Sequence, residues 1–254
     1  MKKMEWTPMF RRYLIKFLFR LVIFLGVLCL YLFSERSLWE LATQPLWKGI
    51  TPMHVLWLIF MVIMLSHIFH GKLRTMALKK AKQEEYIRVD GYSELELYRH
   101  LNTQNIKAWQ VMLVWLIGNA AVGFLYLSGV LGRSDLLMLT VFYFLCDYIC
   151  ILFFCPFQTF LMKNKCCVNC RIYDWGHFMM FTPMLFIPDI YSWSLFFMSC
   201  IVLIRWEIVY AAHMERFWSG SNQVLQCTGC KDKTCQLKKR IRRCFQCYYL
   251  HLLS

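Results

Sequence analysis

The stretch PMHVLWLIFMVIMLSHIFH, residues 52–70, contains no aspartate, glutamate, lysine or arginine in nineteen positions. A helix of about 20 apolar residues spans the ~30 Å hydrocarbon core of a bilayer. This stretch is long enough to cross a membrane as a helix. It therefore decides the class of fold, because a chain that carries such a segment is expected to be a membrane protein.

Comparable apolar runs recur along the chain, whose 254 residues are 59% hydrophobic. A soluble domain of this length rarely carries so much apolar surface. The further runs lie near residues 17–33, 109–131, 136–154, 174–188 and 191–211. We therefore expect an all-α polytopic membrane bundle of about six transmembrane helices over residues 1–212, followed by a basic, cysteine-rich tail over residues 213–254.

The distribution of lysine and arginine decides how often the chain crosses in the last apolar region, which Pro188 and Asp189 interrupt. With six spans, 26 basic residues fall on the side of both termini, and only Arg36, Lys48 and Arg133 fall on the other. The positive-inside rule places the basic side in the cytoplasm. We expect an integral protein of the plasma or inner membrane with both termini cytoplasmic, and leave open whether 174–188 spans fully or re-enters.

The formal net charge of +14 needs no nucleic acid to explain it. Basic loops at every cytoplasmic membrane edge are the ordinary result of this topology, so no nucleic-acid partner is expected. The run KKRIRR, residues 238–243, is instead expected to rest against anionic lipid head groups, at about 1 kcal/mol per basic residue. Nothing in the sequence predicts a protein partner or a transported substrate.

Two Cys-x2-Cys pairs in the tail, CTGC at 227–230 and CFQC at 244–247, form the most specific motif of the chain. Each pair lets two thiolates point at one centre, as in zinc knuckles and ribbons. A reducing cytoplasm makes structural disulfides a poor explanation. Idle thiols and S-acylation are the alternatives to metal binding. The predicted zinc ligands are Cys227, Cys230, Cys244 and Cys247.

A second group of cysteines lies in KNKCCVNCR, residues 163–171, between two apolar segments. We predict a metal centre or iron–sulfur cluster that uses Cys166, Cys167 and Cys170, with either Cys155 or Cys235 as a further ligand. Cys155-Pro156 beside clustered cysteines at a membrane edge resembles the membrane-bound ferredoxin-type electron-transfer proteins. The repeated cysteine pattern of that family is absent. Acylated or idle thiols are again the alternatives.

Asp147 lies inside the fourth predicted span, between Cys146 and Tyr148. An acid at membrane depth is costly and tends to face a bundle interior or an aqueous cavity. The hypotheses for it are an intramembrane proton or ion site and a protonated packing group. The neighbouring pair Cys146 and Cys150 is interpreted as small apolar packing residues.

The sequence thus favours a multi-pass membrane protein with a cytoplasmic, cysteine-ligated metal site, and structural zinc is slightly preferred. An iron–sulfur or thiol-based membrane electron-transfer protein is the first alternative. A transporter-like bundle with an acylated or idle tail is the second. No catalytic residue is predicted, because the chain has no phosphate-binding glycine loop, zinc-protease helix or nucleophile-elbow motif.

Overall fold

The computed structural model describes residues 6–34, 36–69, 76–80, 82–164 and 166–241, which form helices, turns and loops but no β-strand. Five helices in this part of the chain are long and apolar enough to cross a membrane. They are α1 (Pro8–Phe33), α3 (Pro52–Phe69), α5 (Glu94–Leu127), α6 (Arg133–Leu152) and α8 (Ile190–Ala212). The expected all-α fold is confirmed, and its five long apolar helices are consistent with the expected membrane protein.

Side-chain caps fix where several of these helices begin. The Thr7 hydroxyl accepts a hydrogen bond from the Phe10 amide at 3.1 Å, directly before the proline that starts α1. The Asp189 carboxylate accepts one from the Tyr191 amide at 3.0 Å and starts α8. Ser93 caps α5 in the same way. The break expected at Pro188 and Asp189 is therefore present, whereas α5 begins fifteen residues before its predicted start because its polar first half is also helical.

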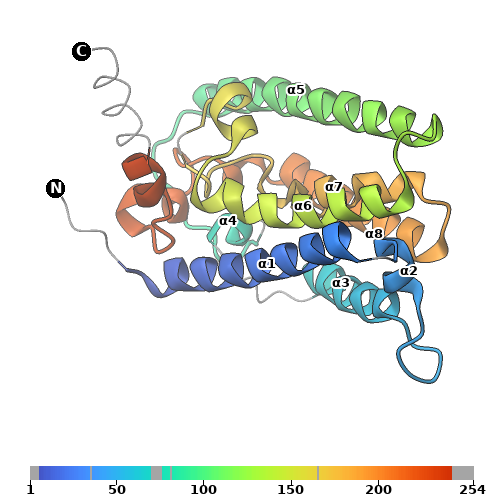
Figure 1. Ribbon diagram of the computed structural model, residues 1–254. Helices are drawn as coiled ribbons and strands as arrows, with labels where there is room; N and C mark the ends of the chain where they lie inside the picture. Colours follow the sequence, from blue (N-terminus) through green and yellow to red (C-terminus); the bar gives the residue numbers. More distant parts are fainter. Residues whose placement is uncertain (1–5, 35, 70–75, 81, 165, 242–254) are drawn as a thin grey trace, which may run out of the picture.

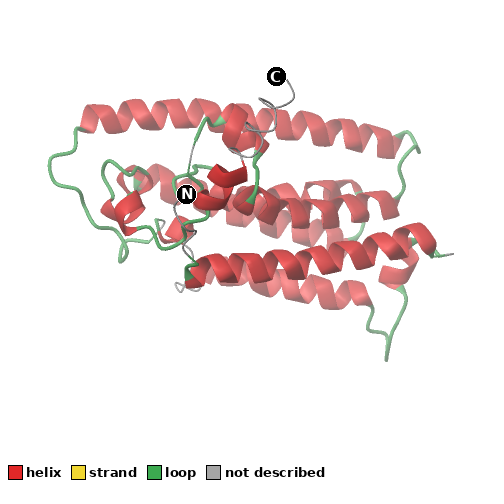
Figure 2. Cartoon of the chain, turned by 60° about the vertical axis from the view of Figure 1, so that its left-hand side comes forward, coloured by secondary structure: helices red, strands yellow, loops and turns green. Residues whose placement is uncertain are grey.

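The long helices lie in three layers in both views (Figures 1 and 2). One face holds α5 alone, the middle layer holds α6, α7 (Gly176–Phe181) and α8, and the opposite face holds α1 and α3. In this arrangement α1 packs on α6, and α3 packs on α8. The short helix α2 (Leu38–Thr43) packs beside α3.

The segment predicted as the fifth span, 174–188, is a composite of short helical pieces. A 3₁₀ turn, η2 (Tyr173–Trp175), leads into α7, and a second 3₁₀ stretch, η3 (Thr182–Phe186), follows. At rises of about 1.5 Å per α residue and 2.0 Å per 3₁₀ residue, this run covers ~25 Å. It is buried among α5, α6 and α8, with Phe181 2% and Ile187 0% exposed. This is an irregular central segment and not a sixth long helix.

Close contact with this central segment holds α5 in place. A Cβ atom on Gly123 would lie 2.3 Å from the Phe186 ring, so only glycine permits the observed approach. About two turns earlier in α5, the Trp115 indole donates a hydrogen bond to the Thr182 hydroxyl at 3.1 Å. The outer side of α5 carries Phe124, which is 71% exposed. Such an apolar outer face is what lipid contact requires.

The start of α1, the end of α6, the loop after it and the tail meet at one end of the bundle, here called the tail end (Figure 1). The Tyr13 hydroxyl donates to the Asp232 carboxylate at 3.2 Å, and Lys80, next to α4 (Met76–Lys79), donates to the Cys170 carbonyl at 2.7 Å. Short helical turns fill this region. They are η1 (Phe157–Leu161), η4 (Met214–Phe217), η5 (Gln223–Leu225), η6 (Cys227–Gly229) and a last helical stretch at 235–241.

Candidate functional site: a cysteine-lined cavity at the tail end

A cavity of about 420 Å³ lies between α6, α7 and the loop that joins them. Its wall is largely apolar and aromatic, but it includes the side chains of five cysteines. These are Cys146, Cys150, Cys155, Cys167 and Cys170. The first two were interpreted from sequence as packing residues, so the structure joins cysteines from a predicted span and from a predicted loop around one space.

Cys155 owes its position to the proline that follows it. The residue before a proline disfavours helical geometry, and α6 ends at Leu152, close to the predicted end of this span. Pro156 then begins the π-helical turn η1. The amide of Gln158 in this turn donates a hydrogen bond to the Cys155 sulfur at 3.4 Å. Amide groups at the start of a helix stabilise a thiolate, so Cys155 sits where a reactive cysteine is favoured.

Several groups around Cys155 shift the pKa of its thiol. A hydrogen bond from the Cys150 thiol has the largest effect, and together with backbone amides and the Lys238 ammonium it lowers the pKa of Cys155 to about 7, against the opposing effect of burial. Burial instead raises the pKa of the Cys170 thiol to about 12 and raises that of Cys167. The cavity wall therefore contains one readily ionised thiol beside thiols that stay protonated.

Lys238 comes from the last helical stretch of the tail and points back into the bundle. Its ammonium donates to the Cys150 carbonyl at 2.5 Å, to Gln158 Oε1 at 2.7 Å and to the Cys167 sulfur at 2.9 Å. The prediction that the run 238–243 rests on lipid is thus wrong for Lys238, whose three donors are used inside the protein. Arg242 and Arg243 lie outside the described residues.

The three cysteines of the loop lie on two different sides of it. Cys167 and Cys170 face the cavity, whereas Cys166 packs with Val168, Leu225 and Cys230 on the side of the tail. Neighbouring positions of this tight loop point in different directions, which separates the two adjacent cysteines.

Lys80 holds the same loop in place through hydrogen bonds to its backbone. It donates to the Val168 carbonyl at 2.9 Å as well as to the Cys170 carbonyl, and it is only 2% exposed. Burial lowers the pKa of Lys80 to about 8. A charged ammonium at this depth is held by carbonyl groups, so the loop carrying the cysteines has a rigid internal support.

The four predicted zinc ligands of the tail are only half described. Cys227 is exposed and Cys230 half-buried, while Cys244 and Cys247 lie outside the described residues. All eleven cysteines in the described ranges are free thiols. Within those ranges, no three His, Cys, Asp or Glu side chains converge as metal ligands would. The zinc and iron–sulfur predictions thus stay predictions.

Asp147 lines the cavity, but it has a partner that the sequence did not indicate. Its carboxylate accepts a hydrogen bond from Arg20 of α1 at 2.7 Å. The same guanidinium donates to the Phe144 carbonyl at 2.6 Å and lies 4.1 Å from the centre of the Tyr148 ring. Asp147 therefore joins α1 to α6 as half of an ion pair, and its role as an intramembrane proton or ion site stays a prediction. The sequence does contain a sign of this ion pair, because the apolar run 17–33 includes one arginine and the apolar run 136–154 includes one aspartate.

A second ion pair joins the cysteine loop to α8. Arg171, 6% exposed, donates both ends of its guanidinium to the Glu207 carboxylate, which also accepts from the Trp175 indole at 2.8 Å. The guanidinium also stacks on Tyr210, 3.5 Å from the ring centre. Bidentate pairing and stacking are the contacts that arginine makes and lysine does not. In the sequence, this arginine was only one of the 26 basic residues that indicate which side of the membrane is cytoplasmic.

Comparison with known protein families, with curated proteins and with solved structures found no match to this chain.

Proposed function

We propose that this protein is a thiol-based electron carrier of the membrane, in which Cys150 and Cys155 alternate between a dithiol and a disulfide. The observation that carries the proposal is the environment of Cys155. A hydrogen bond from Cys150, amides of a helical turn and a lysine ammonium lower its pKa to about 7 in the wall of an apolar cavity. A low-pKa cysteine beside a second thiol is typical of redox-active pairs.

The chemistry balances as two half-reactions. On the tail end, two thiols of a cytoplasmic carrier reduce the Cys150–Cys155 disulfide and become a disulfide themselves, through a mixed disulfide with one cysteine. On the membrane side, the Cys155 thiolate and the Cys150 thiol give two electrons to a hydrogen acceptor. Their sulfurs form the disulfide, and the acceptor gains two protons, one from Cys150 and one from water.

The geometry supports this thiol chemistry better than the structural zinc site that was slightly preferred from sequence. Zinc requires thiolates that converge tetrahedrally. Around the cavity, burial keeps Cys167 and Cys170 protonated, and the Cys167 thiol lies 3.4 Å from the Gln158 carbonyl oxygen, to which it donates. A mixture of one thiolate and several neutral thiols suits exchange chemistry more than metal ligation.

The test is equilibration of the purified full-length protein in mixtures of reduced and oxidised glutathione, followed by quenching and peptide mass spectrometry. We expect one reversible disulfide between Cys150 and Cys155, absent in Cys150→Ala, whereas Cys29→Ala serves as the control and leaves it intact. A stabilised thiolate favours the dithiol, so the disulfide should form only under oxidising ratios. A pair that stays reduced at every ratio, or disulfides scattered over other cysteines, would refute the proposal.

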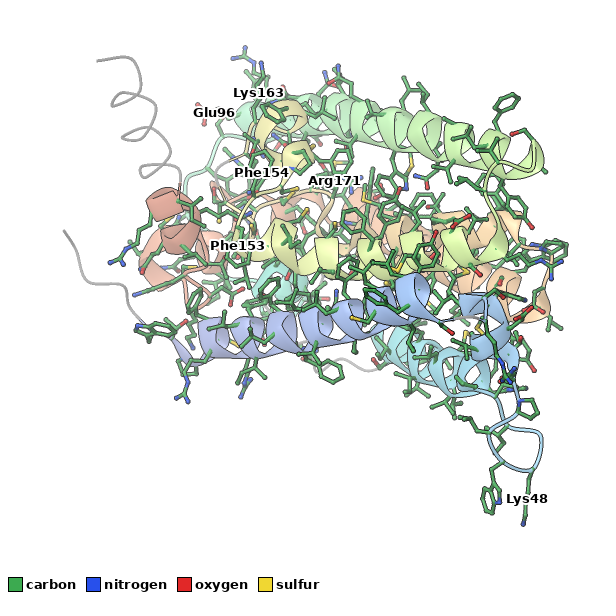
Figure 3. All side chains as sticks on the ribbon, viewed as in Figure 1. Lys48, Glu96, Phe153, Phe154, Lys163 and Arg171 are labelled. Atoms are coloured by element: carbon green, nitrogen blue, oxygen red, sulfur yellow. The ribbon has the colours of Figure 1, made fainter. Side chains whose placement is uncertain are left out.

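The topology proposed with this function has six crossings and a cytoplasmic tail end. Its support is the positive-inside rule applied to the 26 basic residues on that side, together with the position of exposed Lys48 at the opposite end of the bundle (Figure 3). A membrane-impermeant maleimide should label Lys48→Cys in right-side-out vesicles and exposed Cys227 only in inverted vesicles. Labelling of both from one side would contradict six crossings.

A structural zinc site on the tail is a second candidate, favoured by the packing of two cysteines in one small cluster there. Cys166 and Cys230 pack in one small cluster, and both contribute to the raised pKa of Cys235, whose main cause is burial and to which Cys227 also contributes. Metal analysis of anaerobically purified protein decides this. One equivalent of zinc, lost in Cys230→Ser, supports the candidate, and less than a tenth of an equivalent contradicts it.

A further inference from the structure

Gln158 is the one polar side chain of the cavity wall whose bonding capacity is half used. It is 4% exposed, and its Oε1 accepts from the Lys238 ammonium at 2.7 Å and from the Cys167 thiol at 3.4 Å. Because both partners are donors, this oxygen is fixed as the acceptor. The Nε2 group has no hydrogen-bond partner among the described residues. This amide donor is therefore available to an acceptor atom of a bound ligand.

The backbone of the same residue contacts the reactive sulfur. The backbone N–H of Gln158 donates to Cys155 Sγ at 3.4 Å, so the side chain and the thiolate leave the same turn of chain. An acceptor atom bound by Nε2 would therefore be placed near Cys155. This couples recognition of a ligand to the sulfur that the proposed function uses.

The remaining wall sets the character of that ligand. Aromatic side chains surround the space: Trp115, Tyr143, Phe154, Phe157 and Tyr173. The volume of about 420 Å³ falls within the ~300–1,000 Å³ range of small-molecule sites. The wall itself holds no lysine or arginine, and the adjacent Lys238 ammonium already uses its three donors on wall residues, so a phosphate or carboxylate would find no free counter-charge there.

The cavity also reaches the outer surface of the bundle on the side of α5. Phe154, part of its wall and 47% exposed, lies on that side of the end of α6, whereas Phe153 faces α1 and packs on Phe17 (Figure 3). The Trp115 ring of α5 and the Tyr143 ring of α6, 4.7 Å apart, form part of the same wall. Exposed Phe154 is thus the part of the wall that a lipid-soluble molecule can contact from outside the bundle.

We propose that this cavity binds a quinone, with one carbonyl oxygen accepting a hydrogen bond from Gln158 Nε2 and the ring packed among the aromatic side chains beside Cys155. A quinone is flat, uncharged and lipid-soluble, and its polar atoms are acceptors. This inference rests on the proposed function, because it names the hydrogen acceptor for the Cys150–Cys155 pair.

The step conserves atoms and electrons. The Cys155 thiolate and the Cys150 thiol lose two electrons in total and form an S–S bond. The quinone gains these two electrons, the proton released by Cys150 and one further proton from water, and leaves as the quinol. No other oxidant is required.

The experiment mixes the reduced, full-length protein in lipid nanodiscs with decylubiquinone. This quinone is fully substituted, so the thiolate has no free ring position at which to add. Quinol formation is followed by absorbance, and the Cys150–Cys155 disulfide by mass spectrometry. We expect one quinol per disulfide, with saturation as the quinone concentration rises.

Two variants separate the site from the redox pair. Gln158→Glu keeps an oxygen acceptor for Lys238 and Cys167 and replaces the amide donor by a carboxylate that pairs with the Lys238 ammonium, and we expect about tenfold weaker apparent quinone affinity. Ile149→Trp fills the cavity from α6 and should abolish quinone reduction. In both, glutathione should still form the Cys150–Cys155 disulfide.

The outcomes distinguish the two proposals. If glutathione forms the disulfide but decylubiquinone does not, or if neither variant changes quinone reduction, the quinone site is overturned and the thiol carrier stands. If neither oxidant forms the disulfide in the wild-type chain, the proposed function itself fails. Loss of the glutathione disulfide in a variant is a folding or thiolate defect, and the other variant then decides.

Discussion

Replacing Cys150 by alanine should raise the pKa of Cys155, because the hydrogen bond from Cys150 is the largest influence that lowers it. A thiol with the usual pKa of about 8.5 is ~3% ionised at pH 7, and the lowered pKa makes the ionised fraction of Cys155 markedly larger. Alkylation follows the thiolate. In the wild-type chain, Cys155 should therefore react at pH 7 at a markedly larger fraction of its alkaline maximum than the about one-thirtieth expected of an ordinary cysteine.

The assay is iodoacetamide labelling of the folded protein between pH 5.5 and 9.5, with the modified Cys155 peptide quantified by mass spectrometry. Using each variant's own maximum as reference cancels differences in access and in intrinsic nucleophilicity. The midpoint should rise in Cys150→Ala and also in Lys238→Met, while Lys239→Met, at an exposed neighbouring position, should leave it unchanged. A wild-type midpoint near 8.5, or one that Cys150→Ala does not move, refutes this account of the site.

Three further predictions concern how the site is held. Gly123→Ala should lower the free energy of unfolding by about 1–3 kcal/mol, because its Cβ would collide with Phe186. Gly118→Ala on the same helix has open space at its Cβ and should not lower it. Equal melting temperatures of the two variants would contradict this packing. Arg171→Met removes one partner of a half-buried bidentate ion pair, so the free energy of unfolding measured by thermal denaturation should fall by ~3 kcal/mol. A decrease below about 1 kcal/mol would show that solvent already weakens the pair. Because the pKa of Lys80 is lowered to about 8, this side chain binds more protons in the unfolded chain than in the folded chain between pH ~8 and ~10. The stability of the wild-type chain relative to Lys80→Met should therefore rise with pH across this window. A constant difference would be inconsistent with a buried ammonium.

The cysteine loop shows how far sequence reasoning reached into the site. It indicated that Cys155 and the loop cysteines lie near one another, and it placed the end of α6 close to Pro156, because proline restricts the residue before it in any context. It did not separate Cys166 from Cys167. The direction of each side chain in a tight loop depends on what packs above and below it, here Leu225 of the tail and Gln158 of η1.

Two residues of the proposed site were assigned other roles for the same reason. Cys150 was interpreted as packing, although Cys146, Cys150 and Cys155 together mark one region of the chain. Lys238 was counted with a basic run beside lipid, whereas it donates three hydrogen bonds inside the bundle. A basic residue has the same local sequence whether it faces lipid head groups or buried acceptors.

The sequence by itself determined that this chain folds into helices, several of them long and apolar enough to cross a membrane, and that its cysteines are concentrated after the fourth apolar run. These properties follow from hydropathy and from helix boundaries, which are set by residues near one another in the chain. Only the tertiary structure decided that Arg20 neutralises Asp147, that 174–188 forms the buried centre, and that five cysteines surround one cavity. Those facts depend on which faces of distant segments pack together, and hydropathy does not specify that.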